Sequence, residues 1–287
     1  MDTIVTHTHL RVLWDYLTRF TLSLTPAQEY SSACSSPLKA CHSCVLTLDA
    51  PSQAQPISPP VNAAGKSQYS YYVDFQSRIY QIYWTNTLQH PNLSRFPTID
   101  GTAHLVMLSD KMAKVWAASK LLNYGTDGCI RCLHLEPLPI IKIAHPNRLS
   151  RLRVQHEFEM LKEMKHCSLP IPSFGHEPLI DDEGIFGYRM ELLFPIDFSD
   201  VSAVSEDLKA IVSRVHDCGF SHGDLNPSNV MRNSSGSLVL IDPSFSGPNG
   251  RLVPDHIPSS QYKGTTFCTT TDEEYLKMFF GCTTKEG

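Results

Sequence analysis

The chain has 287 residues, of which 41% are hydrophobic, and its formal net charge is -5. This length allows one or two domains with a sizeable core, and the acidic balance argues against a general nucleic-acid-binding protein, whose domains usually carry a basic patch. No stretch is long and apolar enough to span a bilayer, so no membrane partner is expected. Nine irregularly spaced cysteines and no signal-peptide core predict reduced thiols in a cytoplasmic or nuclear protein.

Residues 1–68 are predicted to form an N-terminal extension. A helix is expected over residues 9–22, and residues 26–67 are rich in Ser, Pro, Ala and Gln without sustained periodicity, which is typical of a linker. Within the linker, Cys41 and Cys44 have the spacing of metal ligands, but no second pair follows at the distance that a zinc finger needs. We therefore predict no metal site there.

Residues 69–118 are rich in large aromatic side chains, including Tyr71, Tyr72, Phe75 and Trp84. Leaving so many aromatics exposed would be costly. The segment is therefore expected to be ordered and to pack against the region that follows it.

Two glycines, Gly125 and Gly128, lie between two strand-like runs in residues 121–133. Glycine at such a turn lets backbone N–H groups approach phosphate oxygens closely. A plain hairpin turn would give the same pattern, so both interpretations remain open.

A single lysine, Lys142, interrupts the short apolar strand predicted over residues 139–144. Lysine is almost never buried without a partner, so a carboxylate is expected nearby. The helix predicted over residues 156–166 supplies candidates, with Phe158, Leu161 and either Met164 or Cys167 in one apolar stripe.

The clearest helix is predicted over residues 205–219, after a strand and linker in residues 184–193. Ser205 can cap its start, acidic residues follow in the first turn, and Gly219 comes after the last turn. The helix would deliver the chain into the segment that begins at His222.

The segment from His222 to Asp242 carries the strongest chemical signal. Phosphoryl transfer needs a carboxylate that orients the attacking hydroxyl and accepts its proton, and oxygen ligands that hold Mg²⁺ against the phosphates. Asp224 suits the first task, and Asn229 and Asp242 suit the second. The residues between them predict a β-hairpin, with Asn229 before its first strand and Asp242 after its second. His222 is expected to be structural.

These segments resemble the catalytic and metal-binding loops of the protein-kinase-like superfamily. The general pattern there is His-Arg-Asp-Leu-x-x-x-x-Asn followed by Asp-Phe-Gly. In this chain Gly223 replaces the Arg, and Asp242-Pro-Ser replaces Asp-Phe-Gly. The His-Gly-Asp loop is similar to that of aminoglycoside and choline phosphotransferases and of small atypical kinases. The resemblance covers residues 121–244, about two-fifths of the chain.

The resemblance implies an α+β, bilobal protein-kinase-like fold over residues 119–287. A small antiparallel-sheet N-lobe would occupy residues 119–190, and a reduced, mainly helical C-lobe would occupy residues 191–287. No Ala-Pro-Glu motif follows Asp242, and one capped helix is predicted over residues 271–280. We therefore expect neither a standard peptide groove nor regulation by activation-loop phosphorylation.

The resemblance also implies how ATP would be held. Lys142, paired with Glu157 rather than Glu159, would position the phosphates, and the turn with Gly125 and Gly128 would cover them. The alternative for Glu157 is one more solvated charge on a helix.

The adenine would lie beside the linker that follows residue 190. Met190 would occupy the gatekeeper position, and backbone groups of Glu191 and Leu193 would bond the adenine edge. Apolar side chains would sandwich the ring: Leu122, Ile140, Met231 and Ile241. The same positions would also be apolar if they were simply core residues.

The predicted function is transfer of the γ-phosphate of ATP, with Mg²⁺, to a hydroxyl. An atypical Ser/Thr protein kinase is favoured, because the reduced C-lobe leaves little room for the helices with which small-molecule kinases bind their acceptors. A small-molecule kinase of the aminoglycoside or choline type is the alternative. A pseudokinase scaffold ranks third, since Lys142, Asp224 and Asp242 are all present. The expected partners are ATP and the acceptor, without nucleic acid.

Overall fold

The computed structural model of the chain describes residues 53–62, 68–85, 90–133, 137–196, 201–258 and 265–280. The side chains of residues 201–203 and 279–280 are outside this description. So are the helix predicted over residues 9–22 and the pair Cys41 and Cys44. All the described residues belong to one compact unit, residues 49–287.

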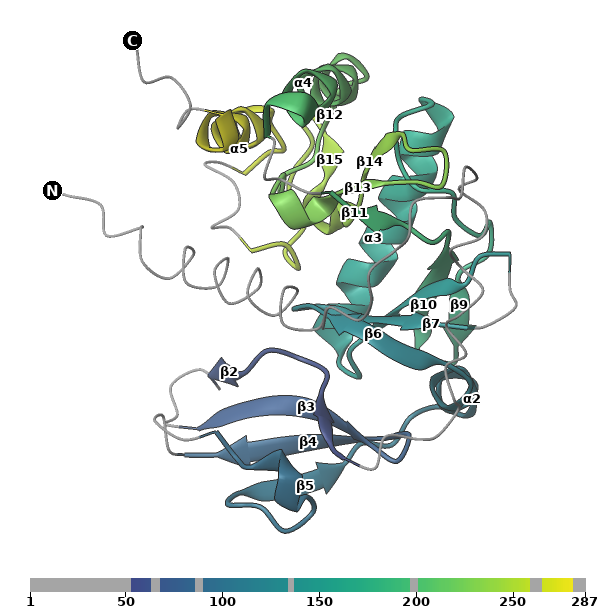
Figure 1. Cartoon of the computed structure of the whole chain (residues 1–287), viewed down its shortest axis with the longest axis vertical. Helices are drawn as coiled ribbons and strands as arrows, with labels where there is room; N and C mark the ends of the chain where they lie inside the picture. The colour runs from purple at the N-terminus through teal and green to yellow at the C-terminus, as the bar shows by residue number, and fades with distance from the viewer. Residues whose placement is uncertain are drawn as a thin grey trace, which may run out of the picture. The chain divides into compact units, whose positions relative to one another are not determined.

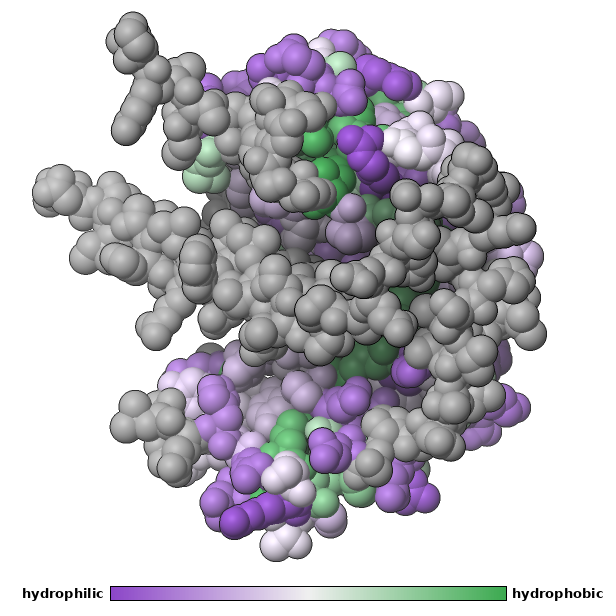
Figure 2. All heavy atoms as spheres, in the orientation of Figure 1, coloured by the Kyte–Doolittle hydropathy of each residue, from purple (hydrophilic) through white to green (hydrophobic). Residues whose placement is uncertain are grey.

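The described residues form a mixed α+β fold in which four antiparallel sheets are combined with four helices (Figure 1). This confirms the predicted α+β class at the coarse level. No described helix is long and apolar enough to cross a membrane. On the face drawn in Figure 2, hydrophobic residues show in limited areas among polar ones.

The first sheet is built from the aromatic-rich segment and the residues just before it. Its strands are β1 (Gln55–Pro56), β2 (Val61–Asn62), β3 (Tyr69–Phe75), β4 (Arg78–Trp84) and β5 (Thr102–Leu105). β3 pairs with β4 along its whole length, and both β1 and β2 pair with β3. The alternation of side chains along β3 and β4 buries Tyr71, Val73, Ile82 and Trp84 in one cluster.

The linker prediction was wrong for residues 53–62. Ile57 is fully buried, and the Ser58 hydroxyl accepts a hydrogen bond from the Tyr72 amide at 2.8 Å. Strands of two residues are too short to show a periodicity in the sequence, so only their pairing with β3 reveals them.

Helix α2 (Asp110–Ala118) joins the first sheet to the second. The Ser109 hydroxyl caps it by accepting a hydrogen bond from the Met112 amide at 3.2 Å. Met112 and Trp116 are buried with Ile57, which follows β1, with Ile79 of β4 and with Ile141 in the second sheet. The aromatic-rich segment therefore shares a core with residues 128–186.

The second sheet has the strand order β6-β7-β8-β10-β9, and all its pairings are antiparallel. The strands are β6 (Lys120–Tyr124), β7 (Gly128–Cys132), β8 (Ile140–Ala144), β9 (Leu179–Asp181) and β10 (Gly184–Met190). Helix α3 (Arg148–His166) packs on β8 and β10 and buries Phe158, Leu161 and Met164, as its predicted stripe requires. Cys167, the alternative to Met164, is exposed.

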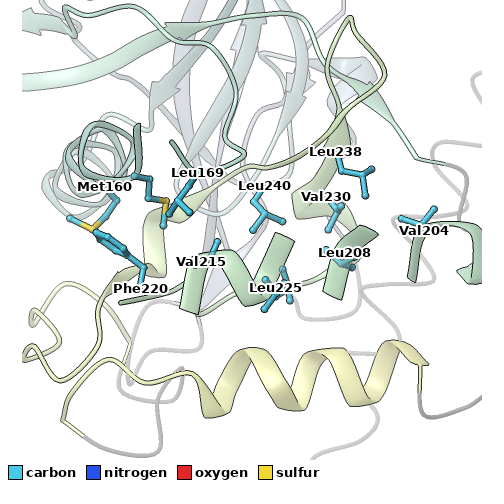
Figure 3. Packing of buried hydrophobic residues seen from close by; sticks show 12 residues of the cluster. Met160, Leu169, Val204, Leu208, Val215, Phe220, Leu225, Val230, Leu238 and Leu240 are labelled. Carbon is cyan, nitrogen blue, oxygen red and sulfur yellow. The ribbon is translucent and has the colours of Figure 1, made fainter. Parts of the chain in front are cut away.

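The remaining elements include the predicted hairpin and, apart from one 3-10 turn that precedes β5, follow β10 in the chain. They are β11 (Phe194–Pro195), α4 (Val201–Asp217), β12 (Phe220–Ser221), β13 (Val230–Arg232), β14 (Leu238–Leu240), β15 (Gly247–Pro248) and α5 (Thr270–Phe280), with 3-10 turns η1 (Leu93–Arg95), η3 (Pro227–Asn229) and η4 (Pro243–Phe245). β13 and β14 pair antiparallel, which confirms the hairpin. Its apolar side chains pack with those of α3 and α4 in a single cluster (Figure 3).

Helix α4 begins before its predicted cap. Its first residue is Val201, so Ser205 lies inside the helix and the predicted start was wrong by one turn. The predicted end is correct, because Gly219 follows the last turn with a left-handed φ of +83°.

Candidate functional site

Lys142 lies at the centre of a buried charge network. All five residues of β8 are buried, and the Lys142 Nζ lies 2.7 Å from Glu157 Oε2 and 2.8 Å from Asp242 Oδ1. The strand supplies the lysine, α3 supplies Glu157, and the end of the hairpin supplies Asp242. Glu159 points elsewhere and accepts a hydrogen bond from Gln155 on the exposed side of the helix. The lysine is thus paired with the glutamate that the resemblance selected.

Tyr188 on β10 completes this network. Its hydroxyl donates a hydrogen bond to Glu157 Oε1 at 2.7 Å, so both oxygens of Glu157 have partners. Burial raises the pKa of Glu157 to about 7, against the opposing effect of Lys142. Burial alone would lower the pKa of Lys142, but Asp242 and Glu157 raise it above its usual value. Nothing in the sequence indicates Tyr188 as a site residue beyond its place in a predicted strand.

Asp242 has an unusual backbone. Its φ of +57° is left-handed, a conformation that non-glycine residues seldom adopt and that is often found at functional sites. Its Oδ1 accepts from Lys142 and from the Ser244 hydroxyl, at 2.8 Å and 2.9 Å. Burial opposes ionisation, yet Lys142 holds the pKa of Asp242 below its usual range. The side chain is 37% exposed, so this carboxylate connects the buried lysine to the surface.

Asp224 and Asn229 form a second, adjacent group. The Asn229 amide donates to the Asp224 backbone oxygen at 2.8 Å and to its Oδ2 at 3.0 Å. The Tyr275 hydroxyl contacts Asp224 Oδ1 at 3.4 Å. Burial, with a further contribution from Asp242, raises the pKa of Asp224. A carboxylate with a raised pKa is a stronger proton acceptor.

Helix α5 fixes the loop that carries Asp224. The buried carboxylate of Asp272 accepts hydrogen bonds from the His222 and Gly223 amides at 2.7 Å and 2.8 Å. The His222 ring lies 3.0 Å from the Ile241 carbonyl, which agrees with a structural role. Gly223 has a φ of +77°, which explains why a glycine suits this position.

Asp272 and Tyr275 were missed as site residues. Their helix was expected, but nothing in the local pattern indicates that its first two turns contact a loop about fifty residues earlier.

The turn between β6 and β7 is a tight hairpin in which the Gly125 amide bonds the Gly128 carbonyl at 2.8 Å. A Cβ at Gly128 would lie 2.3 Å from the Ile143 carbonyl oxygen, so packing against β8 alone accounts for that glycine. Asp127, inside the turn, pairs with Arg153 of α3 at 2.6 Å. This ion pair ties the turn to the helix that carries Glu157.

The residues expected around the adenine differ in how far they are buried. Ile140 and Met190 are buried in one cluster, whereas Leu122 is 50% exposed. Three further residues are half-buried: Leu193, Met231 and Ile241. The Glu191 amide bonds the Ser173 carbonyl at 2.9 Å, and the Glu191 carboxylate accepts from the Ser173 amide at 2.6 Å. The linker is therefore anchored at its first residue.

A surface depression of about 340 Å³ lies beside α3 and does not include this network. It is lined by Arg148, Arg151, Leu152, Gln155, Glu183 and Ile185. Its buried arginine, Arg151, is already paired with Asp181 at 2.8 Å.

The donor set at Asn229 and Asp242 fits Mg²⁺. Asn229 uses its amide nitrogen toward Asp224, which leaves its oxygen for a cation. Asp242 offers a partly exposed carboxylate. Within the described residues no group of three or more His, Cys, Asp or Glu could hold a metal ion. Mg²⁺ needs no such group, because it takes few protein ligands and fills the rest with phosphates and water.

The chain matches no protein-family model, and no curated protein is similar enough to count as a relative. The geometry of its own side chains is therefore the main guide to its chemistry.

Proposed function

We propose that this chain is an ATP- and Mg²⁺-dependent phosphotransferase of the protein-kinase-like type, which transfers the γ-phosphate to a hydroxyl. The observation that carries the proposal is the position of Lys142. A buried lysine held between Glu157 at 2.7 Å and Asp242 at 2.8 Å brings together residues 100 positions apart in the sequence.

Each group has a distinct task in this proposal. Lys142, fixed by Glu157, binds the phosphates of the nucleotide. Asp224 orients the acceptor hydroxyl and takes its proton, for which its raised pKa is suitable. Asn229 and Asp242 would hold Mg²⁺, which neutralises charge on the phosphates when it is bound.

The remaining predicted groups would surround the nucleotide. The turn with Gly125 and Gly128 would lie over the phosphates. Backbone groups of Glu191 and Leu193 would bond the adenine edge, beside Met190. The ring would lie among Leu122, Ile140, Met231 and Ile241.

An atypical Ser/Thr protein kinase is the acceptor class that we favour, with a small-molecule kinase as its rival. One observation favours a second function, that of a nucleotide-binding pseudokinase. The Tyr275 hydroxyl contacts Asp224 Oδ1 at 3.4 Å, in the place where an acceptor hydroxyl would have to lie. If the chain is catalytic, the Tyr275 side chain must move when the acceptor binds, or the acceptor must bind beside it.

The test measures ATP binding and ADP release with the full chain and Mg²⁺, over protein, aminoglycoside and choline acceptors. The key variant is Asp224→Asn, and the matched control is Asp217→Asn, at an exposed aspartate that ends α4. We expect Asp224→Asn to lower turnover by about 10²–10⁴-fold with ATP affinity retained.

Three outcomes separate the possibilities. Turnover that falls only in Asp224→Asn supports the phosphotransferase. ATP binding without ADP release from the native chain indicates the pseudokinase. A native chain that does not bind ATP overturns both.

A further inference from the structure

Two cysteines occupy equivalent positions at the ends of two helices. Cys167 directly follows α3, and Cys218 directly follows α4. Each precedes a residue with left-handed φ, Ser168 at +53° and Gly219 at +83°. Both cysteines are exposed and carry free thiols.

The two helix ends are held against each other. Arg214, in the last turn of α4, donates from Nη2 to the Ser168 carbonyl at 2.8 Å. Its own carbonyl accepts from the Cys218 amide at 3.1 Å. One turn before the cysteines, Met164 and Val215 belong to the same buried cluster. Through Arg214, the residue after Cys167 is tied to the end of the helix that Cys218 follows.

The two thiols are near enough for Cys218 to influence the ionisation of Cys167. Desolvation and the neighbouring Cys218 thiol raise the pKa of the Cys167 thiol. The other described cysteines are less accessible. Cys129 is buried, and its pKa is raised to about 12, while Cys132 and Cys268 are partly buried.

We propose that Cys167 and Cys218 form a reversible disulfide that cross-links the end of α3 to the end of α4. This proposal does not depend on the phosphotransferase. The oxidant would be a small disulfide of the glutathione type. One cysteine thiolate attacks a sulfur of the small disulfide, forms a mixed disulfide and releases one small thiol.

The second cysteine then attacks the cysteine sulfur of that mixed disulfide and releases the second small thiol. The two protons of the cysteines leave with the two small thiols. The protein loses two electrons and the reagent gains them, so the exchange is balanced. Excess small thiol reverses it.

The cross-link would act on two functional elements. α3 carries Glu157, and α4 leads through β12 into the loop of His222 and Asp224. The disulfide closes a loop of about fifty residues, which restricts the unfolded chain and stabilises the folded one. It would also limit movement of α3 relative to α4.

The experiment equilibrates the full chain with oxidised glutathione, blocks free thiols by alkylation and digests it with trypsin. The sequence places Cys167 alone in the peptide 166–189 and Cys218 alone in the peptide 215–232. Mass spectrometry should find these two peptides joined, and dithiothreitol should separate them. The oxidised chain should melt roughly 5–10 °C higher than the reduced one.

Three variants serve as controls. Cys167→Ser and Cys218→Ser should each remove both the joined peptides and the rise in melting temperature. Cys268→Ser changes a cysteine outside the pair and should keep both. The proposal is overturned if the native chain leaves the two thiols open to alkylation, stops at mixed disulfides with glutathione, or joins either cysteine mainly to a different one.

Discussion

Two buried ion pairs start from neighbouring strands of the same sheet, and they differ in how they meet the solvent. Arg131 on β7 pairs with Asp74 of the first sheet at 3.2 Å, and Lys142 on β8 pairs with Glu157 of α3 at 2.7 Å. In both pairs neither side chain is more than 8% exposed. Burial raises the pKa of both carboxyl groups.

The Arg131 pair is enclosed by protein groups. The guanidinium donates to the Ser119 hydroxyl at 2.8 Å and to the carbonyls of Trp116 and Ser119 at 3.1 Å and 2.7 Å. It also lies 3.9 Å from the centre of the Trp116 ring, whose nitrogen donates to Asp74 at 3.1 Å. These contacts join the two sheets and α2, so the pair has a structural role.

The Lys142 pair has a third member that reaches the surface. Asp242 shares the lysine and is 37% exposed, and its backbone is strained. The comparison indicates that burial of an ion pair does not by itself mark a functional site. A buried cation that is also connected to a partly exposed carboxylate is the stronger indication.

The largest expected effect comes from removing each cation in turn. Arg131→Met would leave the buried Asp74 without its cation and with the Trp116 hydrogen bond, and would remove the guanidinium donor from two carbonyls, at a cost of about 3–5 kcal/mol in the free energy of unfolding. Lys142→Met should cost less, about 1–3 kcal/mol. Asp242 can turn to water, and Glu157 keeps the Tyr188 hydrogen bond and can take up a proton near neutral pH.

Urea denaturation of both variants measures the two losses, and nucleotide titration measures function. Lys142→Met should bind ATP more weakly while it stays folded, whereas Arg131→Met should lose stability and ATP binding together. An equal loss of stability in the two variants would remove the distinction between an enclosed and an open pair.

The second expected effect concerns pH. The folded-state pKa of Glu157 is about 7, above its usual 4.5, so the folded protein binds this proton more tightly than the unfolded chain does. The free energy of unfolding should therefore fall as pH rises from about 4.5 to 7, with a slope from this group of at most about 1.4 kcal/mol per pH unit. Glu157→Gln should remove that slope.

Urea midpoints at pH 5, 6 and 7 test this prediction. The exposed Glu159→Gln is the control on the same helix and should keep the native slope. If Glu157→Gln and the native chain show parallel pH profiles, Glu157 does not titrate in this range.

The difference between the two pairs also shows what the sequence can predict. Lys142 stands out as the one charge in an apolar strand, and the resemblance pointed to Glu157. Asp224, Asn229 and Asp242 have a fixed spacing around a hairpin that the structure contains. Site residues of this kind can be predicted from the sequence, because each pattern involves residues that are close to one another in the chain.

The Arg131 pair was not predicted, because nothing near Arg131 indicates a partner 57 residues earlier. The same applies to Tyr188, Asp272 and Tyr275, whose contacts with the site depend on how distant elements pack. β1 and β2 were not predicted, because they lie in a segment of linker-like composition. Tertiary contacts between distant segments thus account for what the sequence did not indicate.

The smallest predicted effect is the energetic coupling between Lys142 and Glu157. Residues in direct contact are non-additive by about 0.5 kcal/mol or more, so a double-mutant cycle of Lys142→Met and Glu157→Gln on ATP affinity should show at least this difference. The matched cycle with Glu159→Gln should be additive, since Glu159 contacts Gln155 on the exposed side of α3. Additivity in the Glu157 cycle, or coupling to Glu159, would show that the contact at 2.7 Å does not position the lysine for a nucleotide. Lys142 would then resemble Arg131, a buried cation that serves the fold alone.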